Sequence, residues 1–137
     1  MISAAVMCLA MNLYHEARGE SLAGNIAVGY VTMNRVADPR YPDTVCGVVQ
    51  QAKYHGWDLV NPIRNRCQFS WYCDGISDNP QDGKAMLESV ILAKHIIAGT
   101  VTDISEGATH YHAKYVNPYW ADDMTVVLEI GQHIFYK

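Results

Sequence analysis

Two glutamates near the amino terminus continue a row of apolar residues that is typical of one helix face. The row includes Leu9 and Leu13, and the next two positions on the same face are Glu16 and Glu20. A carboxylate on a core-facing row is costly unless it has partners or lies at a cleft, so the pattern singles out Glu16. In a partly apolar pocket a carboxyl group keeps its proton near neutral pH. That is the state in which a general acid can protonate a glycosidic oxygen.

Two other interpretations of Glu16 follow from its neighbours. It can be a structural carboxylate paired with Arg18 or Arg35, the commoner role for such a residue. The pair His15-Glu16 also resembles the start of a zinc metalloprotease motif, but that motif needs a second His where this chain has Gly19. The metalloprotease motif is therefore absent.

Aromatic residues beside polar groups are candidates for a sugar-binding groove, because sugar rings stack on aromatic faces while polar neighbours bind the hydroxyl groups. The candidates are Tyr14, Trp71, Tyr111 and Trp120. Gln68 and Ser70 share one face of a predicted strand, where an amide and a hydroxyl can position a ligand. The alternative is that these two form the solvent face of an ordinary hairpin.

His110 and His112 lie two residues apart and share one face of another predicted strand. With His15 or Asp122 they could form a zinc site of the kind that amidases use. We favour hydrogen bonding beside a cleft, which makes His112 a candidate substrate-binding residue and predicts no metal.

Helix signals place Glu16 near a bend. The first helix is expected to stop just beyond Glu16, and Ser21 is a good N-cap for a second helix over residues 22–36. Asp43 or Thr44 can cap a short helix, and Asn79-Pro80 is expected to open a long helix that stops at Gly99.

The remaining segments predict a small antiparallel sheet and one long loop. Residues 50–66 lose all periodicity, whereas residues 67–73 alternate polar and aromatic side chains as a strand would. Residues 109–112 have strand character, and residues 126–136 predict a β-ribbon that turns near Gly131. We therefore expect one α+β domain over residues 1–137, mainly helical.

Composition excludes some partners. The chain has 137 residues, half of them hydrophobic, with a net charge of −4 and a pI of about 5.8, which argues against nucleic acid. Residues 1–13 lack a positive start and are too short to span a bilayer, so we expect neither a signal peptide nor a membrane anchor.

The four cysteines match no zinc pattern. Cys8 is interpreted as a small core residue. Cys46, Cys67 and Cys73 are interpreted as buried thiols. Alternatively, two of these three form a disulfide, and the sequence does not identify which two.

Several blocks together resemble the SleB-type cell wall hydrolases, which include spore cortex-lytic enzymes and phage endolysins. These blocks lie at residues 16–20, 24–36, 41–45, 68–71, 108–112 and 131–135. The resemblance implies a lysozyme-like, lytic transglycosylase-like fold that cuts peptidoglycan between N-acetylmuramic acid and N-acetylglucosamine. It implies Glu16 as the catalytic acid, and it places Gln68, Ser70, Tyr111 and Trp120 in substrate-binding blocks.

The expected mechanism uses one carboxylate and no cofactor. Glu20, Asp58 and Asp74 are unconvincing as the second carboxylate that a hydrolase needs, and Glu20 is better interpreted as a partner of Arg18 or of backbone amides at the bend. A lytic transglycosylase manages with one Glu, acting as acid and then as base, and yields 1,6-anhydro ends. Tyr111 and Gln68 would stabilise or orient the sugar.

Three alternatives remain open: hydrolysis of the same bond by water, a zinc amidase, and a wall-binding module without catalysis. A leaderless catalytic domain is similar to a phage endolysin. We therefore expect a monomer that stays in the host cytoplasm until a holin releases it to the wall.

Overall fold

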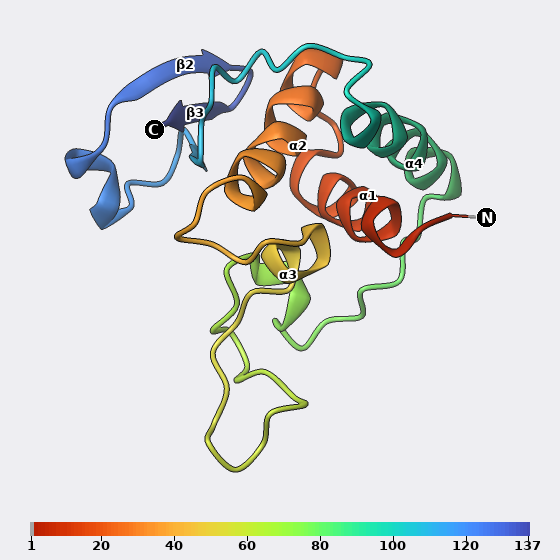
Figure 1. Cartoon of the computed structure of the whole chain (residues 1–137), viewed down its shortest axis with the longest axis vertical. Coiled ribbons are helices and arrows are strands. Elements are labelled where there is room, and N and C mark those ends of the chain that lie inside the picture. Colours follow the sequence, from red (N-terminus) through yellow and green to blue (C-terminus); the bar gives the residue numbers. More distant parts are fainter. Residues whose placement is uncertain (1) are drawn as a thin grey trace.

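Helix α1 (Ala4–Ala17) lies at the centre of the computed structural model, which describes residues 2–137 (Figure 1). The Ser3 hydroxyl caps it by accepting the Val6 amide, and Leu9, Leu13 and Ala17 are fully buried. Three other helices pack against α1. The predicted end just beyond Glu16 is confirmed.

Helix α2 (Leu22–Val36) begins at the predicted cap, where the Ser21 hydroxyl accepts the Gly24 amide. Leu22 at its start is 68% exposed. Helix α4 (Gly83–Ala98) approaches the buried face of α2 closely: a β-carbon on Gly29 would lie 2.5 Å from the Cδ1 atom of Ile96 in α4. The small residues of α2 therefore face the core and the larger Leu22 faces outward.

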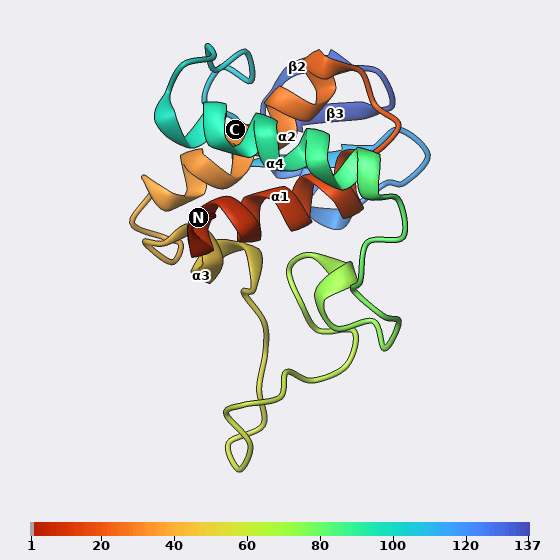
Figure 2. The ribbon, with the colours of Figure 1, turned by 90° about the vertical axis from the view of Figure 1, so that its right-hand side faces the viewer.

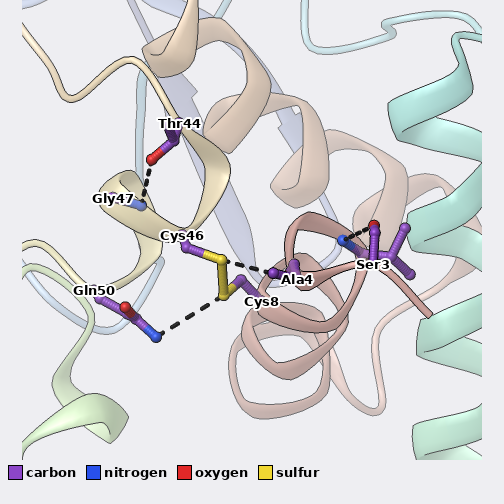
Figure 3. The surroundings of a disulfide bond; sticks show 8 residues. Ser3, Ala4, Cys8, Thr44, Cys46, Gly47 and Gln50 are labelled. Atoms are coloured by element: carbon purple, nitrogen blue, oxygen red, sulfur yellow. Dashed lines mark hydrogen bonds between the residues drawn. A yellow bond between two sulfur atoms is a disulfide. The ribbon is translucent and has the colours of Figure 1, made fainter. Parts of the chain in front are cut away.

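A disulfide joins α1 to the short helix α3 (Val45–Val49), which Thr44 caps (Figure 3). It links Cys8 to Cys46, whose Cα atoms are 5.3 Å apart. Cys8 packs against the core, in line with its interpretation as a small core residue, but the interpretation missed its bond to Cys46. The second disulfide links Cys67 to Cys73, so no cysteine of the described chain is free.

Residues 50–66 form a long irregular loop that projects from the helical body, as predicted (Figures 1 and 2). The strand predicted over residues 67–73 is wrong. Cys67 pairs with Ala52 only as an isolated bridge, and the chain then forms the 3-10 helix η1 (Ser70–Tyr72). Two features override the alternation: the disulfide closes the segment on itself, and a long-range hydrogen bond runs from the Trp71 indole N–H to the Oδ1 atom of Asn12 in α1.

Helix α4 (Gly83–Ala98) ends as predicted at Gly99, which has a φ of 73°. It starts later than Asn79-Pro80 because the Asp82 carboxylate caps it by accepting the Ala85 amide. No helix in residues 2–137 combines the length and the apolar character that crossing a membrane requires.

The sheet consists of β1 (His110–Ala113), β2 (Val126–Ile130) and β3 (His133–Tyr136), and the 3-10 helix η2 (Tyr119–Asp123) precedes β2. Its order is β1-β3-β2, with all pairs antiparallel, and Tyr111 lies opposite Phe135. Phe135 is fully buried against the helices, so the alternation of β1 aims Tyr111 at the helices and His110 and His112 away from them. Both predicted strand segments are confirmed.

Candidate active site

Glu16 lies in the last turn of α1, half-buried, where strand β1 meets the helix. The Tyr111 hydroxyl donates a hydrogen bond of 2.6 Å to its Oε1 atom, across 95 residues of sequence. The helix position and the strand register together create this pair. Neither segment alone could have revealed it.

The environment of Glu16 favours its protonated form. Burial raises the pKa of Glu16, and this effect exceeds the lowering by the Tyr111 hydrogen bond and by the charges of His133, His15 and Arg35. Glu16 therefore keeps its proton to higher pH than an exposed glutamate. This is the property expected of a general acid.

Neither arginine proposed as a structural partner pairs directly with Glu16 in the described chain. Arg18 donates to the Tyr14 hydroxyl. Arg35 is 2% exposed, its Nε atom donates to the Thr109 carbonyl at 2.7 Å, and its guanidinium carbon lies 5.0 Å from the centre of the Tyr41 ring. The paired-carboxylate interpretation of Glu16 is therefore wrong, although Arg35 acts on it electrostatically.

The η1 segment is fixed beside the same turn of α1. The His15 ring stacks on Trp71 with centroids 4.6 Å apart, and its Nε2 atom lies 3.0 Å from the Asp78 carbonyl oxygen. In Figure 2 the end of α1 lies between the strands and this segment. Trp71 is only 9% exposed, so it packs under the site rather than presenting a ring face to a ligand.

The other predicted groove residues lie in different surroundings. Tyr14 is buried, and its hydroxyl accepts the amides of Gln81 and Asp82, which fixes the approach to α4. Gln68 and Ser70 are exposed at the entrance to η1, and no hydrogen bond in the described chain joins either of them to Glu16.

His112 and Trp120 belong to a cluster on the face of the sheet opposite Tyr111. The His112 Nε2 atom lies 2.6 Å from the Tyr136 hydroxyl, and the Trp120 ring centre lies 5.7 Å from that of His112. The pKa of His110 is lowered to about 4, mainly by burial and to a smaller extent by the charges of Arg35 and Arg40. The alternative zinc site is not assembled: residues 2–137 contain no group of three or more His, Cys, Asp or Glu that could hold a metal ion.

His133 and Glu20 are functional candidates that the sequence analysis missed or misread. The Nδ1 atom of His133 lies 3.0 Å from the Oε1 atom of Glu20, and the His133 and Tyr111 rings form a T-shaped pair with centroids 5.2 Å apart. Glu20 thus contacts His133 and accepts the backbone amide of Gln132 in the β2–β3 turn, whereas Arg18 or backbone amides at the bend are the partners expected from the sequence. The spacing of the residues could have indicated His133. It lies two residues before Phe135 and so shares the face of β3 that contacts Tyr111.

The other carboxylates considered have local structural partners. The Asp58 carboxylate accepts the amides of Val60 and Asn61 in the projecting loop. Asp74 accepts the Ile76 amide. In the described chain, the charged groups that shift the pKa of Glu16 include no second carboxyl group.

Comparisons with known proteins agree with this geometry. A model of the cell wall hydrolase family matches residues 19–136. The spore cortex-lytic enzyme of Halalkalibacterium halodurans is 28% identical over 134 residues, 95% of this chain and 34% of that protein. The corresponding enzyme of Oceanobacillus iheyensis is 26% identical over 136 residues, 96% of this chain and 41% of that protein. The chain thus spans less than half the length of these curated relatives.

Solved structures cover the whole arrangement, including the turn that carries Glu16. The catalytic domain of the germination-specific lytic transglycosylase SleB from Bacillus anthracis matches with a TM-score of 0.69 and 28% identity over 97% of this chain and 93% of that one. The catalytic domain of the Bacillus cereus SleB protein matches with a TM-score of 0.66 and 26% identity over 100% of this chain and 93% of that one. The predicted lysozyme-like α+β fold is confirmed, and the chain belongs to the cell wall hydrolase family.

Proposed function

We propose that this chain cleaves the bond between N-acetylmuramic acid and N-acetylglucosamine in peptidoglycan, as a lytic transglycosylase with Glu16 as its single catalytic carboxyl group. The observation that carries the proposal is the site of Glu16: a half-buried carboxyl group with a raised pKa and a tyrosine donor, and no second carboxyl group acting on it in the described chain. The likeness to a SleB lytic transglycosylase domain supports the same reaction.

The proposed reaction has two proton transfers through one side chain. Protonated Glu16 first gives its proton to the glycosidic oxygen as the bond from the muramic anomeric carbon to that oxygen breaks. The muramic 6-hydroxyl then attacks the anomeric carbon, and the Glu16 carboxylate takes the hydroxyl proton. The products are a free N-acetylglucosamine hydroxyl and a 1,6-anhydro end, and Glu16 is protonated again.

Tyr111 keeps one oxygen of Glu16 occupied during both steps. Its hydroxyl donates to Oε1, which leaves Oε2 to carry the proton that moves. Burial and the charge of Glu16 raise the pKa of Tyr111 well above its ordinary value, so the phenol remains a donor at every working pH. Tyr111 therefore orients the acid and does not exchange protons with it.

Tyr111→Phe is expected to lower kcat by about 10- to 100-fold, because a hydrogen bond to a charged group contributes about 1.5–3 kcal/mol. The pKa of Glu16 should rise further, because the lost hydrogen bond lowers it. Rates of glycan cleavage across a pH series test both effects. Tyr30→Phe is the matched control: it loses a hydroxyl hydrogen bond to the Val101 carbonyl, which involves none of the candidate site residues, and it should keep nearly full activity. Equal losses in the two variants would contradict this role.

The buried carboxyl group also predicts a pH-dependent stability. The pKa of Glu16 is higher in the folded chain than its ordinary value of 4.5, so the folded state binds more protons above that pH. Its stabilising contribution is complete below pH 4.5 and is lost as pH rises through the folded-state pKa. Glu16→Gln should therefore gain stability relative to the wild type as pH rises from 4.5 to neutrality, measured by urea unfolding at several pH values. A constant difference between the two proteins would contradict the raised pKa.

A clearing assay tests the proposed activity against its rivals. Purified peptidoglycan should lose turbidity on incubation with the protein, with the same rate in the presence of a chelator. Clearing that stops with the chelator would indicate a metal-dependent amidase, and binding without clearing would indicate a wall-binding module.

We further propose an endolysin role, with action in the wall compartment after release through a holin. The two disulfides support work in an oxidising compartment. Production of the protein in a bacterial host should lyse the cells only when a holin is co-produced. Lysis that is independent of the holin would contradict this route.

A further inference from the structure

The bend between α1 and α2 contacts the turn between β2 and β3 through one side chain. The Glu20 Oε1 atom accepts the Gln132 amide at 3.2 Å and lies 3.0 Å from the Nδ1 atom of His133. The turn backbone is pressed against the carboxylate: a β-carbon on Gly131, whose φ is 56°, would lie 3.2 Å from the same oxygen. Glu20 therefore anchors the start of β3 to the helices at the base of the site.

His133 connects this anchor to the candidate acid. It is 9% exposed, and its Nδ1 atom is buried and makes no aligned hydrogen bond within the described chain, so the nearby Glu20 oxygen is the acceptor that it approaches. Its ring packs against the Tyr111 ring in a T-shaped arrangement, with ring centroids 5.2 Å apart, and Tyr111 donates to Glu16. A continuous series of side-chain contacts therefore runs from Glu20 through His133 and Tyr111 to Glu16.

We propose that Glu20 and His133 are positioning residues for the glycan cleavage proposed above: Glu20 holds the His133 ring and the β2–β3 turn, and His133 holds Tyr111 so that its hydroxyl stays on Glu16. The inference rests on the proposed function for its catalytic consequence. Its structural part, the coupling to Glu16, does not depend on the substrate.

The Glu20–His133 pair also acts on Glu16 through the charge of His133. The groups facing Glu16 are Tyr111 from β1, His133 from β3, His15 from α1 and Arg35 from α2. A protonated His133 lowers the pKa of Glu16, as does the Tyr111 hydrogen bond. Loss of the Glu20–His133 pair should weaken both the Tyr111 hydrogen bond and the effect of the His133 charge. Each loss raises the pKa of Glu16, so the two effects add.

The test measures the titration of Glu16 itself by carbon-detected NMR of protein with ¹³C-labelled glutamate carboxyl groups, with the Glu16 signal identified by its loss in Glu16→Gln. Glu20→Gln and His133→Asn should each shift the Glu16 titration to higher pH. Each should also lower kcat by about 10- to 100-fold with little change in KM, since small misplacements of catalytic groups have effects of that size. The double variant should be no worse than the more damaging single variant, because both act through one contact.

Glu129→Gln removes another ion pair of the same sheet, that with Lys114 at 3.4 Å on the exposed surface, and should leave titration and rate unchanged. If His133→Asn does not fold, Glu20→Gln carries the positioning test, and His133→Phe, which keeps a ring beside Tyr111 but loses the imidazole charge, should still shift the Glu16 titration to higher pH. An unchanged Glu16 titration in folded variants would overturn the inference. A shifted titration in a protein that never cleaves peptidoglycan would instead overturn the proposed function.

Discussion

Glu16→Gln is expected to lower the rate of peptidoglycan cleavage by about 10²- to 10⁴-fold, the range for loss of a general acid or base. Glutamine has nearly the same shape and can still accept the Tyr111 hydrogen bond, so the site should keep its geometry. It can neither give a proton to the glycosidic oxygen nor take one from the muramic 6-hydroxyl. Both steps fail, and the effect should appear in kcat rather than in substrate binding.

The matched control for this variant is Glu88→Gln. Glu88 lies exposed on α4 and makes no hydrogen bond or contact described for the Glu16 site, so its replacement should change the rate less than twofold. Far-UV circular dichroism should show the same helix content for both variants. A folded Glu16→Gln protein with more than a tenth of wild-type activity would contradict the assignment.

Removal of the Cys8–Cys46 disulfide should cost about 4 kcal/mol of unfolding free energy, an estimate from the loop entropy of residues 38 apart in sequence. This is a large share of the roughly 5–15 kcal/mol that stabilises a typical domain. The bond ties α3 to α1, and α3 has only five residues, so it cannot persist as an isolated helix. Urea unfolding of the Cys8→Ser/Cys46→Ser protein measures the loss.

The second disulfide is the internal comparison. Cys67 and Cys73 are only six apart in sequence, and the same estimate gives about 2 kcal/mol for their bond. The Cys67→Ser/Cys73→Ser protein should therefore be the more stable of the two double variants. The opposite order would show that loop length does not determine how much each disulfide stabilises the fold. It would also show that the η1 segment with Trp71 contributes more of the stability.

The helices and the candidate acid could be predicted because their signals are local. Ser21, Thr44 and Gly99 act within a few residues of the helix ends that they define, and their roles are confirmed. Glu16 stood out because it continued an apolar row, and the structure places it half-buried at the end of that row. Periodicity and capping are properties of one segment, so one sequence is enough to predict them.

The incorrect predictions arose where distant residues decide the local structure. Residues 67–73 alternate like a strand, but the long-range hydrogen bond from Trp71 to Asn12, together with the disulfide that closes the segment on itself, holds them in a different conformation. The pairing of Cys8 with Cys46 and the contact of Glu20 with His133 are also long-range. Nothing in the local sequence of either member identifies its partner.

The tyrosine that bonds to Glu16 was a candidate for a weaker reason than the one that the structure provides. The sequence indicates Tyr111 as an aromatic face near polar residues, whereas its hydroxyl is the part that reaches the acid. Strand register decides this, because a shift of one residue would aim His110 or His112 at α1 instead. Register depends on the pairing of β1 with β3 and could not be predicted from β1 alone.

Mass analysis of the soluble muropeptides tests the central claim most directly. Purified peptidoglycan is digested with the wild-type protein and, in parallel, with Glu16→Gln. The account predicts glycan ends that are lighter by one water than reducing ends, present with the wild type and absent with the variant. Reducing ends would indicate attack by water, and stem peptides released from intact glycan, or anhydro ends produced equally well by Glu16→Gln, would contradict the account.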